Sequence, residues 1–249
     1  MSNQSFNYIL VGGYTATGSS AAIDLLKECT GVYAPDWEFR LIIDPHGVID
    51  LDRALNDPID TLNQDVAIRE FLDFINKYSR CGGGFRPYGM NYNTVFGKRL
   101  LSLAQEYINQ LTDYSYVGYW WYLEFFKPYT TYIAHKILKK IKVYDARKHS
   151  TMRLYCKSDE EFIRITTEYI NSIFAALVAE RGIDCHTLVL DQAVPVNRAV
   201  YANRCFAAPK IISVDRDPRD VFIGIITEEQ RNGDLVGHVG FDVASSHNI

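Results

Sequence analysis

The sequence predicts an α/β fold in which helices cover a central, mainly parallel β-sheet. Short β-type runs alternate with helix-type segments at both ends of the chain, a pattern typical of parallel strands joined by helical crossovers. The middle, about residues 60–150, reads instead as a helical insertion. With 249 residues, 47% hydrophobic and 22% charged, the chain can bury a sizeable core. We therefore predict a single α/β domain over residues 1–249.

The first part of the chain predicts a strand, a loop and a helix. The β-type run 8–11 ends in glycines, and apolar residues then follow at helical spacing: Ala22, Leu25, Leu26 and Cys29. A second strand is predicted at Phe39 to Ile43, before the turn-type segment 44–47.

Residues 64–110 are predicted to be mostly helical, interrupted by the glycine run 82–84. The aromatic-rich segment 114–132 supports two interpretations. Core packing is favoured, and the lining of a pocket for a sugar-like or aromatic acceptor is the alternative.

The last third predicts one long helix and then a regular alternation. Ser158 and Glu161 have the spacing of a capping box that opens an amphipathic helix, which Gly182 is expected to end. A strand (187–190), a helix (197–206), a strand (210–214) and a helix from Pro218 follow. This alternation predicts a parallel sheet covered by helices.

Two loops between a predicted strand and a predicted helix, residues 12–20 and 215–220, are candidate phosphate-binding loops. Such a loop aims backbone N–H groups and the positive end of a helix at an anion. The presence of two such loops suggests that the ligand is a nucleotide with two separate phosphate groups.

The first loop has the glycine spacing of a phosphate loop between Gly13 and Gly18, but Ser19 and Ser20 follow where the ATP- and GTP-binding version requires Lys and then Ser or Thr. Because that lysine supports the phosphates during transfer, its absence argues against an ATP-dependent kinase. A glycine-rich turn without a ligand stays open as the alternative.

In the second loop, Asp217 is predicted to cap the following helix and Pro218 to occupy its first turn. Arg216 is then left at the strand end, where a guanidinium can grip a phosphate with two hydrogen bonds. For Arg219 and Asp220 we favour a structural ion pair.

Residues 210–222 resemble the segment by which sulfotransferases hold the 3′-phosphate of 3′-phosphoadenosine 5′-phosphosulfate, and Gly18, Ser19 and Ser20 resemble their phosphosulfate loop. Residues 187–192 also lie where that family places a strand leading to its active site. The resemblance implies a divergent bacterial member with a three-layer α/β/α fold of the P-loop type. It implies sulfonate transfer, without a metal, from that co-substrate to a hydroxyl of a glycan or small-molecule acceptor, such as one used in cell-surface polysaccharide synthesis.

The resemblance also assigns donor-binding residues: Gly13, Tyr14, Thr15, Ala16, Thr17, Gly18, Ser19, Ser20, Arg216 and Gly224. Two of them depart from the family pattern, since Ala16 stands where a Lys or Arg is common and Gly224 where many members have a serine. The family also continues further past its second motif than this chain does, so a truncated or minimal version is expected.

Sulfonate transfer needs a general base, a cation near the bridging oxygen and donors for the equatorial oxygens. The resemblance makes Glu38 a candidate base with Arg40 as a candidate cation. Asp191 is a second candidate base because it ends a predicted strand, and Arg198 is a second candidate cation. Purely structural roles stay open for all four.

The formal net charge of −4 argues against a nucleic-acid partner. Five cysteines without a CxxC pair favour reduced thiols, and neither a signal peptide nor a run long enough to span a membrane is readable, so we expect a cytoplasmic location. The alternative functions are a kinase-like phosphotransferase and a non-catalytic relative that binds a nucleotide or glycan. The sequence predicts neither the acceptor nor the oligomeric state.

Overall fold

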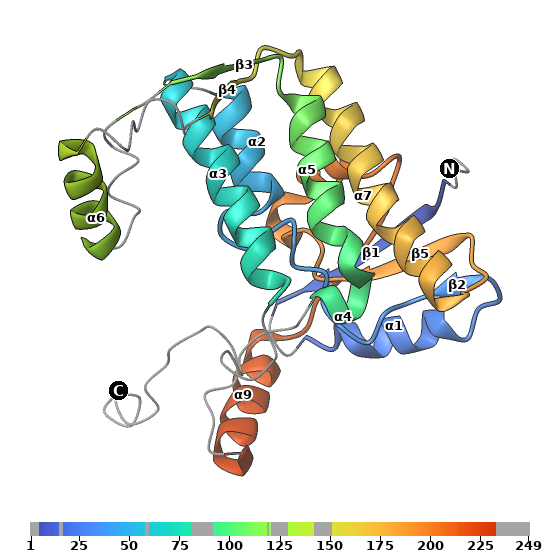
Figure 1. The fold of residues 1–249 in the computed structure, drawn as a ribbon. Coiled ribbons are helices and arrows are strands. Elements are labelled where there is room, and N and C mark those ends of the chain that lie inside the picture. The colour runs from blue at the N-terminus through green and yellow to red at the C-terminus, as the bar shows by residue number, and fades with distance from the viewer. Residues whose placement is uncertain are drawn as a thin grey trace. The chain divides into compact units, whose positions relative to one another are not determined.

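The computed structural model describes residues 5–14, 17–57, 60–80, 92–118, 120, 129–141 and 151–232. It is an α/β structure with a mainly parallel central sheet, as predicted. The chain forms two compact units, one of residues 1–47 and 166–249 and the other of residues 48–165. The central sheet lies in the first unit (Figure 1).

The sheet has four described strands: β1 (Asn7–Gly13), β2 (Val32–Tyr33), β5 (Thr187–Asp191) and β6 (Lys210–Val214). Their order is β2-β5-β1-β6, and all the pairings are parallel. Three of these strands are confirmed predictions. Because the strands are parallel, the loops that follow β1, β5 and β6 all leave the sheet at its carboxyl edge.

Side chains of β1 alternate between the two faces of the sheet. Val11 packs into a buried cluster with Ile23 of α1 (Ser19–Lys27). On the opposite face, the ring centroid of Tyr8 lies 4.8 Å from that of Phe206 and 6.1 Å from that of Phe174. Helical segments therefore cover both faces of β1, an arrangement compatible with a three-layer fold.

Helix α7 (Asp159–Arg181) begins and ends as the sequence predicts, and it belongs to both units. The backbone N–H of Glu161 donates to Ser158 Oγ, and that of Ser158 donates to Glu161 Oε2, both at 3.3 Å. Gly182 follows the helix with a φ of 62°, a conformation that favours glycine. The capping box and the glycine stop are both confirmed.

By length and composition α7 could also cross a membrane, although 56% of its apolar window is buried inside the protein. The core helix of a globular protein passes the same test, so this is weak evidence for a membrane span.

The strand predicted at Phe39 to Ile43 is wrong, because the chain forms a buried turn there. The backbone N–H of Asp44 donates to the carbonyl of Arg40 at 2.9 Å, and Leu41 and Ile42 are fully buried. The apolar run reflects burial of this turn rather than strand pairing, and the short strand β2 occupies the sheet edge instead.

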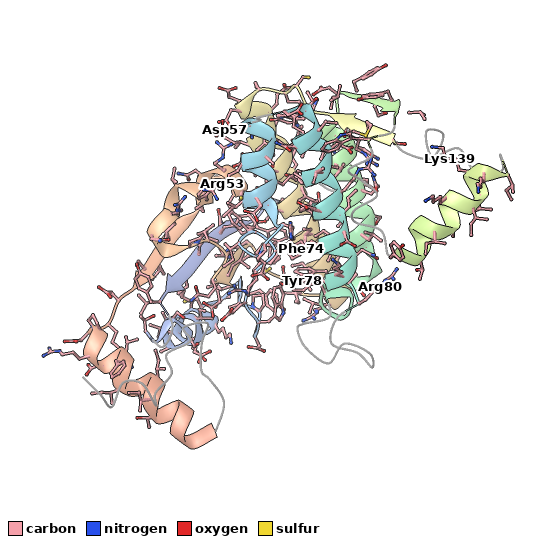
Figure 2. The ribbon with its side chains drawn as sticks, turned by 90° about the vertical axis from the view of Figure 1, so that its left-hand side faces the viewer. Arg53, Asp57, Phe74, Tyr78, Arg80 and Lys139 are labelled. Atoms are coloured by element: carbon pink, nitrogen blue, oxygen red, sulfur yellow. The ribbon has the colours of Figure 1, made fainter. Side chains whose placement is uncertain are left out.

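The second unit is mainly helical. Its described elements are α2 (Val48–Asn56), α3 (Thr61–Tyr78), α4 (Tyr92–Phe96), a 3₁₀ turn (Gly97–Arg99), α5 (Leu100–Leu111), β3 (Tyr114–Val117), α6 (Tyr129–Lys140) and β4 (Thr151–Leu154). Phe74 and Tyr78 lie one helical turn apart near the end of α3, and their ring centroids are 4.3 Å apart (Figure 2). The predicted helices within 64–110 are confirmed where the chain is described, and the glycine run 82–84 lies outside the described residues.

Core packing, the favoured interpretation of segment 114–132, is wrong at the start of that segment. Residues 114–117 form β3, which pairs antiparallel with β4, and Tyr114 and Tyr116 are 62% and 40% exposed. Both tyrosines lie on one face of a two-stranded ribbon, which is too narrow to cover them. Tyr119 and residues 121–128 lie outside the described residues.

The predicted helix 197–206 forms as two short pieces, a 3₁₀ segment η4 (Val196–Tyr201) and α8 (Ala202–Cys205). The backbone of Arg198 leaves the helical region, with φ −137° and ψ 44°. The predicted helix from Pro218 is confirmed as α9 (Pro218–Asn232).

Candidate active site at the carboxyl edge of the sheet

The loop after β1 approaches its neighbours too closely for a side chain at Gly13. A Cβ there would lie 2.1 Å from Thr17 Oγ1 and 2.9 Å from the carbonyl oxygen of Val214. Thr17 closes the loop by donating from its hydroxyl to the carbonyl of Tyr14 at 2.8 Å. Glycine at position 13 is therefore a steric requirement of this loop.

Helix α1 begins directly after the loop without a side-chain cap. Gly18 is the N-cap residue, with φ 94° and ψ 26°, and it has no side chain that could cap the N–H groups of the first turn. The first turn of a helix has N–H groups without intrahelical partners and carries the positive end of the helix dipole. The N–H groups that follow Gly18, including those of Ser19 and Ser20, are thus suited to an anion.

The two candidate bases, Glu38 and Asp191, lie side by side although they are far apart in the sequence. They form a single parallel bridge, in which the backbone N–H of Phe39 donates to the carbonyl of Asp191 at 3.0 Å. Asp191 ends β5, next to the end of β1. Two carboxylates therefore meet beside the first phosphate-type loop.

The environment of Asp191 raises its carboxyl pKa from 3.8 to about 6. Burial is the main cause and the negative charge of Glu38 is the second, while hydrogen bonds from the Ser19 side chain and the Gln192 backbone oppose the rise. Asp191 Oδ1 is buried and has no hydrogen-bond partner in the described part of the chain. A carboxylate with this pKa can take up a proton near neutral pH.

Glu38 differs from Asp191 because a cation holds it. Arg40 donates from Nη1 to Glu38 Oε2 at 3.3 Å and from Nε to Asp44 Oδ1 at 2.8 Å. The Arg40 charge is therefore shared between two carboxylates. Asp191 therefore combines a buried carboxylate oxygen that has no partner in the described part of the chain with a raised pKa, to which the charge of Glu38 contributes.

Two contributions to this site escape sequence reasoning. Gln192, with φ 52°, donates from its side-chain amide to the carbonyl of Gly13 at 3.2 Å and so ties β5 to the loop after β1. Asp44 is the second partner of Arg40, and their four-residue spacing does not predict a contact in a segment whose apolar run favours a strand.

The second phosphate-type loop follows β6, which pairs with β1 so that Val214 lies opposite Gly13. Asp217 Oδ1 accepts from the backbone N–H of Arg219 at 2.9 Å, and Pro218 opens α9, so both capping predictions are confirmed. Arg216 is exposed at the end of the strand. The two loops thus leave neighbouring strands at one edge of the sheet.

The predicted ion pair of Arg219 with Asp220 is wrong, because Arg219 pairs with Asp217. Its guanidinium makes two hydrogen bonds to that carboxylate, at 2.6 Å and 3.0 Å. The capping geometry turns the Asp217 carboxylate back over the first turn, where it meets the side chain of Arg219. The pair lowers the pKa of the Asp217 carboxyl.

Not all predicted site residues join this edge. Arg198 is exposed on η4, and in the described part of the chain no contact links it to Asp191 or Glu38. Gly224 lies in α9 with open space where a Cβ would project. Thr15 and Ala16 lie outside the described residues, and no group of side chains able to hold a metal occurs among those that are described.

The connections of β1 and β5 define where a ligand would sit. β1 leads into α1 on one face, whereas β5 leads into η4 and α8, whose neighbour Phe206 packs on the opposite face. In open α/β sheets such a divergence opens a crevice at the carboxyl ends of the strands. The candidate residues therefore lie at the carboxyl edge of the sheet, which is where open α/β sheets bind their ligands. Searches against known protein families, curated proteins and solved structures found no match for the chain.

Proposed function

We propose that this chain is a sulfotransferase-like enzyme of the P-loop type with a three-layer α/β/α fold. It would transfer a sulfonate group from 3′-phosphoadenosine 5′-phosphosulfate to a hydroxyl of a glycan or small-molecule acceptor. The observation that carries the proposal is the parallel pairing of β1 and β6, with Gly13 opposite Val214. It brings two phosphate-type loops to one edge, as a donor with separate 5′ and 3′ phosphates requires.

The donor would lie across that edge. The 5′-phosphosulfate fits the uncapped start of α1 after Gly18, where backbone N–H groups can hold the sulfonate oxygens. The 3′-phosphate fits the exposed guanidinium of Arg216. This division leaves the sulfur atom on the side of the site where Asp191 ends β5.

Asp191 is the proposed general base. Its carboxylate would take the proton of the acceptor hydroxyl as the acceptor oxygen bonds to sulfur. The bond between sulfur and the bridging phosphate oxygen breaks at the same time, and adenosine 3′,5′-bisphosphate leaves. Arg40 would act mainly by holding Glu38 in place, because both of its described partners are carboxylates.

The proposal is tested by calorimetric titration with adenosine 3′,5′-bisphosphate without metal, compared with ATP and magnesium. We expect the bisphosphate to bind and Arg216→Ala to lower its affinity by about 10- to 100-fold, the usual cost of losing hydrogen bonds to a charged group. The matched control is Arg219→Ala, which removes an equal charge whose described partner is Asp217.

A preference for ATP with magnesium would instead favour a kinase-like phosphotransferase. Bisphosphate binding without sulfonate transfer to any acceptor would favour a non-catalytic relative. Binding of neither nucleotide would overturn the nucleotide site.

A further inference from the structure

Helix α6 exposes a line of isoleucines to solvent. Ile133, Ile137 and Ile141 recur every four residues over the helix and the residue that follows it, so they lie along one side. Their side chains are 41%, 58% and 61% exposed. Three large aliphatic side chains in one exposed row indicate a binding surface rather than scattered surface apolarity.

The same helix is cationic within an acidic protein. Lys136, Lys139 and Lys140 are all exposed, and residues 129–141 contain no Asp or Glu, whereas the whole chain has a formal net charge of −4. Figure 2 shows Lys139 on this helix. Residues three or four positions apart lie on the same side of a helix. Since Lys139 and Lys140 follow Lys136 by three and four residues, the lysines lie together along one flank of the isoleucine row.

These two features together select the partner. A purely apolar partner would leave the lysines without compensating charge, and a purely acidic one would leave the isoleucines in water. A bilayer with anionic headgroups satisfies both, because the isoleucines enter the headgroup–acyl boundary while the lysines meet the phosphates. A helix with an apolar row and a basic flank is typical of such surface binding.

We propose that α6 is a membrane-surface helix that docks this protein on anionic lipid. The lysines supply attraction that falls with ionic strength, and the isoleucines supply burial. The inference rests on α6 alone and does not depend on sulfonate transfer.

The test is co-sedimentation of the full chain with vesicles of phosphatidylcholine, with and without phosphatidylglycerol. Binding is expected only to the anionic vesicles and is expected to weaken as salt is raised. Lys139→Gln with Lys140→Gln should lower binding by roughly 25-fold, since each lysine near an anionic surface contributes about fivefold. Ile137→Asp should lower it at least about tenfold.

Matched controls separate docking from general surface effects. Lys77→Gln with Lys210→Gln removes the same charge from α3 and β6. Ile223→Asp changes an isoleucine of α9 that is 61% exposed, close to the 58% of Ile137. Both controls should bind anionic vesicles like the wild type.

Several results would overturn the proposal. These are failure of the wild type to bind anionic vesicles, equal loss in the control variants, and binding that α6 substitutions leave unchanged. If Ile137→Asp instead lowers the melting temperature without affecting vesicle binding, the isoleucine row packs on the chain itself. If it converts a dimer to a monomer with vesicle binding unchanged, the partner is a second copy.

Discussion

The two phosphate-type loops follow neighbouring strands of one sheet, yet different kinds of contact fix their conformations. The loop after β1 is fixed partly by residues distant in the sequence, because Gly13 packs closely against the carbonyl of Val214 and Gln192 donates to the carbonyl of Gly13. The loop after β6 is fixed by its own residues, since Asp217 binds both the backbone and the side chain of Arg219. A site whose groups are fixed in advance suits stabilisation of a reacting group, whereas an exposed charge mainly adds affinity.

This difference suggests that the two loops have different roles in the proposed reaction. Changes near β1 and β5 should affect chemistry and folding, and changes near β6 should affect donor binding.

Replacement of the proposed base gives the largest effect. Asp191→Asn should lower sulfonate transfer by about 10²- to 10⁴-fold, the usual contribution of a general base, while leaving bisphosphate affinity within a few-fold. The measurement is single-turnover transfer with a calorimetric titration alongside. Glu38→Gln is the matched control and should cost much less, since Arg40 already holds that carboxylate. Equal losses in both variants would contradict the assignment of the base to Asp191.

The second-largest effect is expected when a side chain is added at Gly13, in the loop after β1. Gly13→Ala places a Cβ against Thr17 and the carbonyl of Val214, so it should destabilise the fold by about 1–3 kcal/mol and abolish measurable bisphosphate binding. Denaturant unfolding and calorimetry measure the two effects. Gly224→Ala is the control, because the space around that helical position is open and alanine favours helices. A Gly13→Ala variant as stable as the wild type would show that the loop yields easily.

The pH dependence of sulfonate transfer should follow the titration of Asp191. Because the Asp191 carboxyl has a pKa of about 6, transfer should rise as pH increases through 6 and the base loses its proton. The negative charge of Glu38 contributes to that pKa, so Glu38→Gln should move the midpoint to lower pH. An unchanged midpoint would mean that the two carboxylates do not interact.

The same group affects stability. Its folded-state pKa lies above the unfolded value. Between pH 3.8 and about 6 the folded protein therefore retains this proton more fully than the unfolded chain does. The contribution of Asp191 to the unfolding free energy should therefore decrease as pH rises through that range, relative to Asp191→Asn. Urea unfolding of both proteins at several pH values measures the difference, and parallel curves would contradict the raised pKa.

The smallest effect is expected at α9. Gly224→Ser introduces a hydroxyl at a position with room for it, so under the proposed function bisphosphate affinity should rise a few-fold. Gly224→Ala is again the control, since it fills the position without a hydroxyl. Equal affinities of the two variants would remove Gly224 from the donor site.

The sequence predicts the strands better than it predicts the site. Runs 8–11, 187–190 and 210–214 are apolar because strands of a covered parallel sheet are buried, and all three form. The segment 39–43 is equally apolar for another reason, burial within a turn, which residue type alone does not distinguish.

The carboxylate pair could not be predicted as a pair. The sequence makes Glu38 and Asp191 separate candidate bases, but their adjacency depends on a parallel bridge between distant segments, which no local pattern encodes. Likewise, Arg40 reaches Asp44 only because the chain turns between them. Local signals such as the capping box at Ser158 were readable because both partners lie within one helical turn.

A crystal structure of the full chain with adenosine 3′,5′-bisphosphate would show whether the two loops hold one donor. We expect the 5′-phosphate at the N–H groups that open α1 after Gly18, and the 3′-phosphate at Arg216. A nucleotide bound away from the carboxyl edge of β1, or bound there with its 3′-phosphate directed away from Arg216, would contradict this placement.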